Sequence, residues 1–155
     1  HPRTLPGMPG GEYIANSDEH GAGGLVDETA ENRNSANQRR LHKFDQIKKE
    51  IPLPQIIGDS KKALISWGSH KHIVAESAKE LNFTHIHFSH LWPLPHDLEK
   101  TLSPFEKIIV AENNTTGQLA RLLTMETRLK IGSFGEDSGR PISIESIVNF
   151  VKHES

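Results

Sequence analysis

The sequence has 155 residues and a formal net charge of −2, and 34% of its residues are hydrophobic. This length suits one domain with a real core and is short for two. There is no basic excess of the kind that binds nucleic acid, and no apolar run nears the roughly 20 residues that cross a membrane. The sequence contains no cysteine, which excludes disulfides, iron–sulfur ligation and thiol catalysis by these residues. The first residue is His1 rather than Met, which suggests a part cut from a longer chain, a processed chain or a tag remnant. From the composition we expect a cytoplasmic protein that contacts neither nucleic acid nor membrane.

The first half of the chain has two parts of different character. Residues 1–30 are dense in Pro and Gly, which predicts an extended arm or linker that docks on a neighbouring domain or stays flexible. Residues 31–54 contain a predicted connecting helix over 31–50, with a narrow apolar stripe of Leu41, Phe44, Ile47 and Ile51. Ser35 and Gln38 fit a capping box, and Pro52 and Pro54 end the helix.

Strand and helix patterns alternate through the rest of the chain. Strands are predicted within residues 61–69, 83–93 and 106–112, and helices within 70–82, 98–102, 115–129 and 143–153, the last with Ser143 as its N-cap. Such alternation is typical of a parallel sheet with helices on both faces. We therefore predict an α/β domain over residues 55–155, a three-layer sandwich with a mostly parallel sheet and an extended N-terminal arm.

Two turns between a strand and a helix are candidate ligand sites. The first contains Gly68 and Ser69, where the N–H groups at a helix start could bind an anion, although a tight turn with Ser69 as N-cap explains the same residues. The second contains Glu112, Asn113, Thr116 and Gln118 at the end of a strand, where ligands and partners of open α/β sheets lie. Thr115 and Gln118 fit a capping box there. We expect an interface or structural role at this turn and identify no catalytic residue.

Histidines and one tryptophan are the remaining candidates. His85 and His87 would share one face of a strand, and His70, His72 and His90 lie nearby in the sequence. This pattern can chelate zinc or copper, but it supplies no complete ligand set, so we expect no metal site. Trp92, in the sequence Leu-Trp-Pro-Leu-Pro at 91–95, could form a protein-contact ridge or close the core of the sheet.

Several of these motifs, taken in order, resemble the C-terminal domain of the alpha subunit of 2-oxoacid:ferredoxin oxidoreductases. The motifs are Trp-Gly-Ser at 67–69, Leu-Trp-Pro-Leu-Pro at 91–95, the run from Val110 to Ala120 that contains Gly-Gln-Leu-Ala, and Gly-Arg-Pro at 139–141. Upstream, Pro-Arg-Thr-Leu-Pro-Gly at 2–7, Gly-Gly-Glu-Tyr at 10–13 and the pair Glu19-His20 also match, although Gly-Ala-Gly-Gly follows at 21–24 where the family often has acidic residues. The resemblance covers nearly the whole chain.

The resemblance implies a fold like the transketolase C-terminal domain and a role in assembly. The whole enzyme would convert a 2-oxoacid to an acyl-coenzyme A and reduce ferredoxin, using thiamine diphosphate, magnesium and iron–sulfur clusters that other parts bind. Residues 1–30 would then come from the linker after a pyrimidine-binding domain, and that domain and the beta subunit would be the partners. Arg3, Glu19, His20, Trp92, Glu112, Asn113, Thr116 and Gln118 would lie at such interfaces. The 2-oxoglutarate type fits best, and pyruvate and branched-chain relatives remain open.

Three other classes of protein stay open. One is a free-standing, flavodoxin-like domain that binds a nucleotide or another anion at the Ser69 or Gly117 turn. Another is a metal protein that uses the histidines. The third is the C-terminal domain of a related thiamine enzyme.

Overall fold

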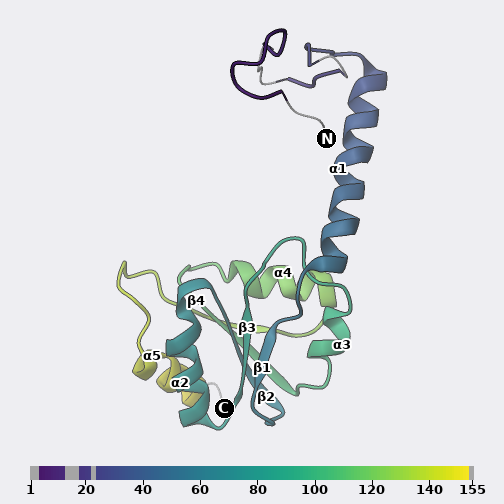
Figure 1. The fold of residues 1–155 in the computed structure, drawn as a ribbon. Helices are drawn as coiled ribbons and strands as arrows, with labels where there is room; N and C mark the ends of the chain where they lie inside the picture. The colour runs from purple at the N-terminus through teal and green to yellow at the C-terminus, as the bar shows by residue number, and fades with distance from the viewer. Residues whose placement is uncertain (1–3, 13–17, 22–23, 154–155) are drawn as a thin grey trace. The chain divides into compact units, whose positions relative to one another are not determined.

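The computed structural model describes residues 4–12, 18–21 and 24–153 and separates into two compact units, residues 1–47 and 48–155 (Figure 1). Among the described residues, no helix is both long and apolar enough to cross a membrane.

The second unit is built on a five-stranded sheet with the strand order β1-β3-β2-β4-β5. The strands are β1 (Gln55–Ile57), β2 (Lys62–Trp67), β3 (Thr84–Phe88), β4 (Lys107–Glu112) and β5 (Gly132–Gly135). The pairs β2–β3, β2–β4 and β4–β5 are parallel, and only the edge strand β1 runs antiparallel, along β3. The predicted α/β fold with a mostly parallel sheet is confirmed.

Helices cover both faces of this sheet, which makes the three layers (Figure 1). Alternate residues of β2 and β4 enter two cores, because side chains along a strand point to opposite faces. Ile65 and Val110 pack with α3 (Leu98–Leu102) and α4 (Gln118–Thr127). Leu64 and Ile109 pack on the other face with α2 (Lys71–Leu81) and α5 (Ile144–His153). A 3-10 turn, η1 (Gly68–His70), joins β2 to α2.

The sequence patterns located β2, β3, β4 and all four helices of this unit, and they missed the two edge strands. β1 has three residues, all exposed, and β5 is Gly-Ser-Phe-Gly with one buried side chain. Neither strand carries a buried apolar run, so hydrophobic periodicity could not reveal it. The predicted N-cap Ser143 is confirmed, because its Oγ accepts the N–H of Ser146 at 3.0 Å.

The helix α1 (Ala30–Glu50) lies mostly in the first unit and begins five residues before Ser35, the first residue of the predicted capping box. The predicted capping box of Ser35 and Gln38 is wrong, because both residues lie inside the helix. Thr29 holds the N-terminus instead: its Oγ1 accepts the N–H of Asn32, and its carbonyl accepts the N–H of Arg33. Asp27 accepts the N–H and hydroxyl of Thr29, and these bonds hold the pKa of the Asp27 carboxyl below its usual value.

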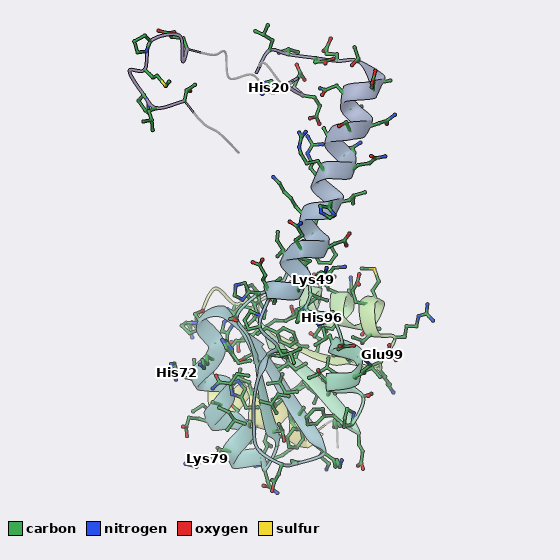
Figure 2. All side chains as sticks on the ribbon, turned by 45° about the vertical axis from the view of Figure 1, so that its right-hand side comes forward. His20, Lys49, His72, Lys79, His96 and Glu99 are labelled. Carbon is green, nitrogen blue, oxygen red and sulfur yellow. The ribbon has the colours of Figure 1, made fainter. Side chains whose placement is uncertain are left out.

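Most of α1 is exposed, and Ala36 is its one buried residue among those described. The predicted stripe is present, but Leu41, Phe44 and Ile47 are 65%, 38% and 41% exposed. Ile51, one residue beyond the helix, is buried. Figure 2 shows the side chains that project along α1, with Lys49 labelled near its end.

Candidate functional site

The end of β4 places a fully buried carboxylate at the N-terminus of α4. Glu112 Oε2 accepts the N–H of Leu119 at 2.9 Å and the side-chain amide of Asn114 at 2.7 Å. Its Oε1 accepts the N–H of Ala120 at 3.3 Å and the hydroxyl of Ser133 at 3.2 Å. A helix N-terminus stabilises negative charge through its free N–H groups. Glu112 therefore occupies, from within the chain, the place where an anionic ligand would bind.

Asn114 completes the cap of α4. Its Oδ1 accepts the N–H of Thr116 at 3.2 Å and that of Gln118 at 3.1 Å. The capping box predicted from Thr115 and Gln118 is wrong, because the N-cap position is Gly117 and the Thr115 hydroxyl donates to Asp137 at 2.7 Å. The sequence showed Glu112 and Asn114 but not that these two side chains do the capping.

The other predicted residues of this turn lie at its surface. Asn113 is exposed and donates its side-chain amide to the carbonyl of Arg140 at 3.3 Å. Thr116 and Gln118 are also exposed. An interface role for these side chains stays a prediction.

Gly117 is required at this junction for two reasons. Its φ of +62° lies in the left-handed region, and an added Cβ would come within 2.8 Å of Ser133 Oγ. Gly139 also has a positive φ, +74°, but nothing lies within 4 Å of the position of its Cβ.

We expect Gly117→Ala to lower the free energy of unfolding by about 2–3 kcal/mol, and Gly139→Ala by about 1 kcal/mol. The difference isolates the clash with Ser133 from the backbone strain that both substitutions share. Urea unfolding followed by circular dichroism measures both values. Equal losses in the two variants would show that Ser133 moves aside without cost.

The second predicted site, at Gly68 and Ser69, is an exposed turn. Gly68 has a φ of +57°, and the predicted N-cap role of Ser69 is wrong: His70 occupies the N-cap position of α2, without a capping side-chain bond. Two buried nitrogen atoms beside this turn, Trp67 Nε1 and His70 Nδ1, have no hydrogen-bond partner among the described residues. The two rings meet edge to face, with centroids 6.5 Å apart.

His85, Ser66 and His87 form a polar chain under α2. Ser66 Oγ lies 2.8 Å from His85 Nε2 and 2.9 Å from His87 Nδ1. The hydroxyl has one proton, so it donates to one ring and accepts from the other. Burial lowers the pKa of His85 to about 4, and the charges of His87, Lys71 and His72 contribute. Burial also lowers the pKa of His87, again helped by Lys71 and His72.

The predicted sharing of one face by His85 and His87 is therefore confirmed. Across residues 4–12, 18–21 and 24–153, however, no three His, Cys, Asp or Glu side chains are arranged to hold a metal ion. His72 is exposed on α2, where Figure 2 labels it. The sequence predicted the shared face, but it gave no sign that Ser66 would join the two rings.

The remaining predicted interface residues lie in both units. Trp92 is 59% exposed and lines a hollow of about 340 Å³ with His96, Glu99 and Lys100. Its neighbour Leu94 is buried, so of the two residues it is Leu94 that closes the core.

Three predicted residues belong to the arm. Glu19 is half-buried and forms an ion pair with Arg40 of α1, which holds the pKa of the Glu19 carboxyl below its usual value. His20 forms an isolated antiparallel bridge with Val26. Arg3 lies outside the described residues.

A hollow of about 660 Å³ lies against α4 and β5 in the second unit. Its lining includes Gly117, Arg121, Thr124, Ser133 and Phe150. Two of these residues lie beside Glu112: Ser133 donates its hydroxyl to the Glu112 carboxylate, and Gly117 is the N-cap position of α4. This side of the β4–α4 junction is therefore the part of the candidate site that remains open to a ligand or a partner.

The fold is similar to that of a solved enzyme structure. The chain aligns over 99% of its length, with a TM-score of 0.82 and 28% identity, with 2-oxoglutarate:ferredoxin oxidoreductase from Magnetococcus marinus. That structure contains 2-oxoglutarate, coenzyme A and succinyl-CoA, and the alignment covers 28% of its chain. The fold is also consistent with that of transketolase C-terminal domains.

Sequence comparison narrows the similarity to one subunit. The chain is 30% identical over 147 residues to the alpha subunit of 2-oxoacid:ferredoxin oxidoreductase from Saccharolobus solfataricus. This alignment covers 87% of the present chain and 23% of the relative. It is 30% identical over 148 residues to the alpha subunit of oxidoreductase 1 from Aeropyrum pernix, covering 86% of this chain and 23% of the relative. The corresponding subunit from Sulfurisphaera tokodaii is 32% identical over 133 residues, 80% of this chain and 21% of that one. The chain thus spans about a quarter of the length of these curated relatives, and no protein-family model matches it.

Proposed function

We propose that this chain is the C-terminal assembly domain of the alpha subunit of a 2-oxoacid:ferredoxin oxidoreductase. Support comes from alpha subunits of this name that are about 30% identical over 80–87% of the chain. In this proposal residues 1–30 are the linker that follows a pyrimidine-binding domain. Residues 31–54 form the helical segment that connects this linker to the assembly domain, residues 55–155. The preceding domain and the beta subunit are its partners, and ferredoxin is an indirect partner.

The whole cytoplasmic enzyme would oxidatively decarboxylate a 2-oxoacid to an acyl-coenzyme A and reduce ferredoxin. The 2-oxoacid of the solved relative is 2-oxoglutarate, which makes it the first substrate to test. Thiamine diphosphate, magnesium, the iron–sulfur clusters and coenzyme A would be bound by other parts of the enzyme. The 155 residues contain no cysteine and so offer no thiolate to an iron–sulfur cluster. No reaction step is assigned to this chain, and we expect the isolated chain to be inactive.

The buried carboxylate of Glu112 is the observation that carries the assembly role. In open α/β sheets, ligands bind beyond the carboxyl ends of the strands, often at a helix N-terminus. Here the N–H groups of Leu119 and Ala120 in α4 already bind Glu112. Asn114 binds the N–H of Gln118 and that of Thr116, just before the helix. The junction is stabilised from within the chain, and its exposed side chains are left for contact with another protein surface.

Hydrogen exchange tests the assembly role. Amide hydrogen exchange is measured for the isolated chain and for the same residues within the full-length alpha subunit purified with its beta subunit. We expect added protection in the arm, in α1 and around residues 113–118, because these surfaces would become buried. Exchange that is unchanged in all three segments would contradict the proposal.

A second candidate is a free-standing domain that binds a nucleotide or another anion. The unpartnered Trp67 Nε1 and His70 Nδ1 beside the Gly68–Ser69 turn favour it. Thermal unfolding of the isolated chain with and without coenzyme A or ATP distinguishes the two. A rise of several degrees in Tm would favour binding, since a ligand of the native state stabilises it, whereas an unchanged Tm favours assembly.

A further inference from the structure

The C-terminal half of α1 carries an exposed apolar face that is defined by Leu41, Phe44 and Ile47. The three residues are spaced by three positions, so they follow one side of the helix. Their exposed fractions of 65%, 38% and 41% are unusual for large apolar side chains gathered on one helix face. We call these three residues the α1 face.

Basic side chains surround the α1 face. By helical spacing, Arg40 and Lys48 lie on the same side as Phe44, and Lys43 lies at its border. The whole helix carries six basic and three acidic residues, a formal charge of +3, although the full chain carries −2. The other 134 residues therefore carry −5, and the positive charge is concentrated on α1.

An acidic side chain of the arm already pairs with a basic side chain of α1. Glu19 forms an ion pair with Arg40, which lies at the N-terminal end of the α1 face. The charges of Arg40, Arg39 and Arg33 all lower the pKa of the Glu19 carboxyl. The arm thus supplies a carboxylate to the N-terminal half of the helix, and the α1 face continues beyond that contact with Lys43 and Lys48 at its rim.

A second copy of this chain is a poor match for the α1 face. Pairing two such helices would place like charges of +3 side by side, and three apolar side chains bury far less than the ~1,200 Å² of a stable interface. The face is better suited to be one part of a larger contact with a different surface.

We propose that the α1 face binds the beta subunit of the same enzyme complex, at a surface that is apolar at its centre and carries carboxylates at its rim. This inference rests on the proposed assembly function and specifies the chemistry of the partner. Apolar contacts would supply affinity through Leu41 and Phe44, and Lys43 and Lys48 would orient the partner.

The test uses the full-length alpha subunit purified with its beta subunit. The molecular mass by light scattering and the dissociation constant are measured at several salt concentrations. Leu41→Gln with Phe44→Gln should raise the dissociation constant by about tenfold or more, because the apolar contact is lost while the helix-forming tendency is kept. Lys43→Glu with Lys48→Glu should raise it by about tenfold, and the effect should shrink as salt is added.

A matched pair on the opposite side of α1 serves as the control. Arg39→Glu with Lys49→Glu makes the same change in charge, but both side chains point away from Phe44 by helical spacing. We expect this pair to change the dissociation constant by less than about twofold. The Tm of each variant chain alone shows that its fold is kept.

The outcomes separate this inference from the proposed function. If the complex forms and all three pairs bind like the original protein, the α1 face is not the contact and only this inference fails. Equal losses from the two charge pairs would also overturn it, because the effect would then depend on total charge. If the original protein forms no complex, the proposed function itself fails. A dimer of the isolated chain that Leu41→Gln with Phe44→Gln abolishes would identify a second copy as the occupant.

Discussion

Replacing Glu112 by Ala should lower the free energy of unfolding by about 3–5 kcal/mol, because it leaves a group of buried donors without an acceptor. The carboxylate accepts bonds from Leu119 N–H, Ala120 N–H, Asn114 and Ser133, and its exposed fraction is 0%. Glu112→Gln keeps the size but turns an amide group toward one of these donors. We expect that variant to lose about 2 kcal/mol.

Urea unfolding monitored by circular dichroism measures these losses. Glu106→Ala is a matched control, because Glu106 is exposed and immediately precedes β4. It should change the free energy of unfolding by less than about 0.5 kcal/mol. A loss below about 1 kcal/mol for Glu112→Ala would mean that water or another side chain replaces the carboxylate.

The second large effect is a loss of stability in mild acid that depends on His85. Burial lowers its folded-state pKa to about 4, against about 6.5 in the unfolded chain, and nearby His87, Lys71 and His72 add to the shift. The unfolded state therefore binds more protons than the native state between these two values. This contribution is complete above about pH 7 and is lost as the pH falls from 6.5 toward 4.

Between pH 7 and pH 5 the loss from His85 should be about 2 kcal/mol. His85→Gln removes the titrating group, so its stability should fall less over this interval than that of the original chain. Val74→Ala is the control: Val74 is buried on α2, over the same face, and does not titrate. Val74→Ala should lower the free energy of unfolding by a similar amount at every pH, so its change with pH should match that of the original chain. Equal slopes for the original chain and His85→Gln would contradict the assignment.

The sequence predicted features that depend on neighbouring residues and missed those that depend on residues brought together by the fold. The strand over residues 107–112 was evident from its apolar run, and the start of α5 from Ser143, because both signals lie within a few residues. The cap of α4 was predicted with the wrong residues: Glu112 lies six residues before the helix and reaches it only because β4 and α4 meet in space. Ser66 likewise comes between His85 and His87 through the pairing of β2 with β3, which the sequence does not state.

The family resemblance was predicted better than any single site. It rested on the order of many short motifs, and similarity to alpha subunits over 80–87% of the chain supports it. The roles of Trp92, Asn113, Thr116 and Gln118 stay predictions. These side chains are exposed, and their partners would belong to other chains or domains.

The two edge strands bear on how this chain behaves outside a complex. An open strand edge can recruit the edge of another molecule and start aggregation. Here one edge is β1, only three residues long and preceded by Pro54, which has no N–H to offer. The other is β5, four residues long with a glycine at each end. Both edge strands are too short to template a growing sheet, so the sheet itself should resist fibre formation. Any aggregation of the isolated chain should instead come from its exposed helix α1.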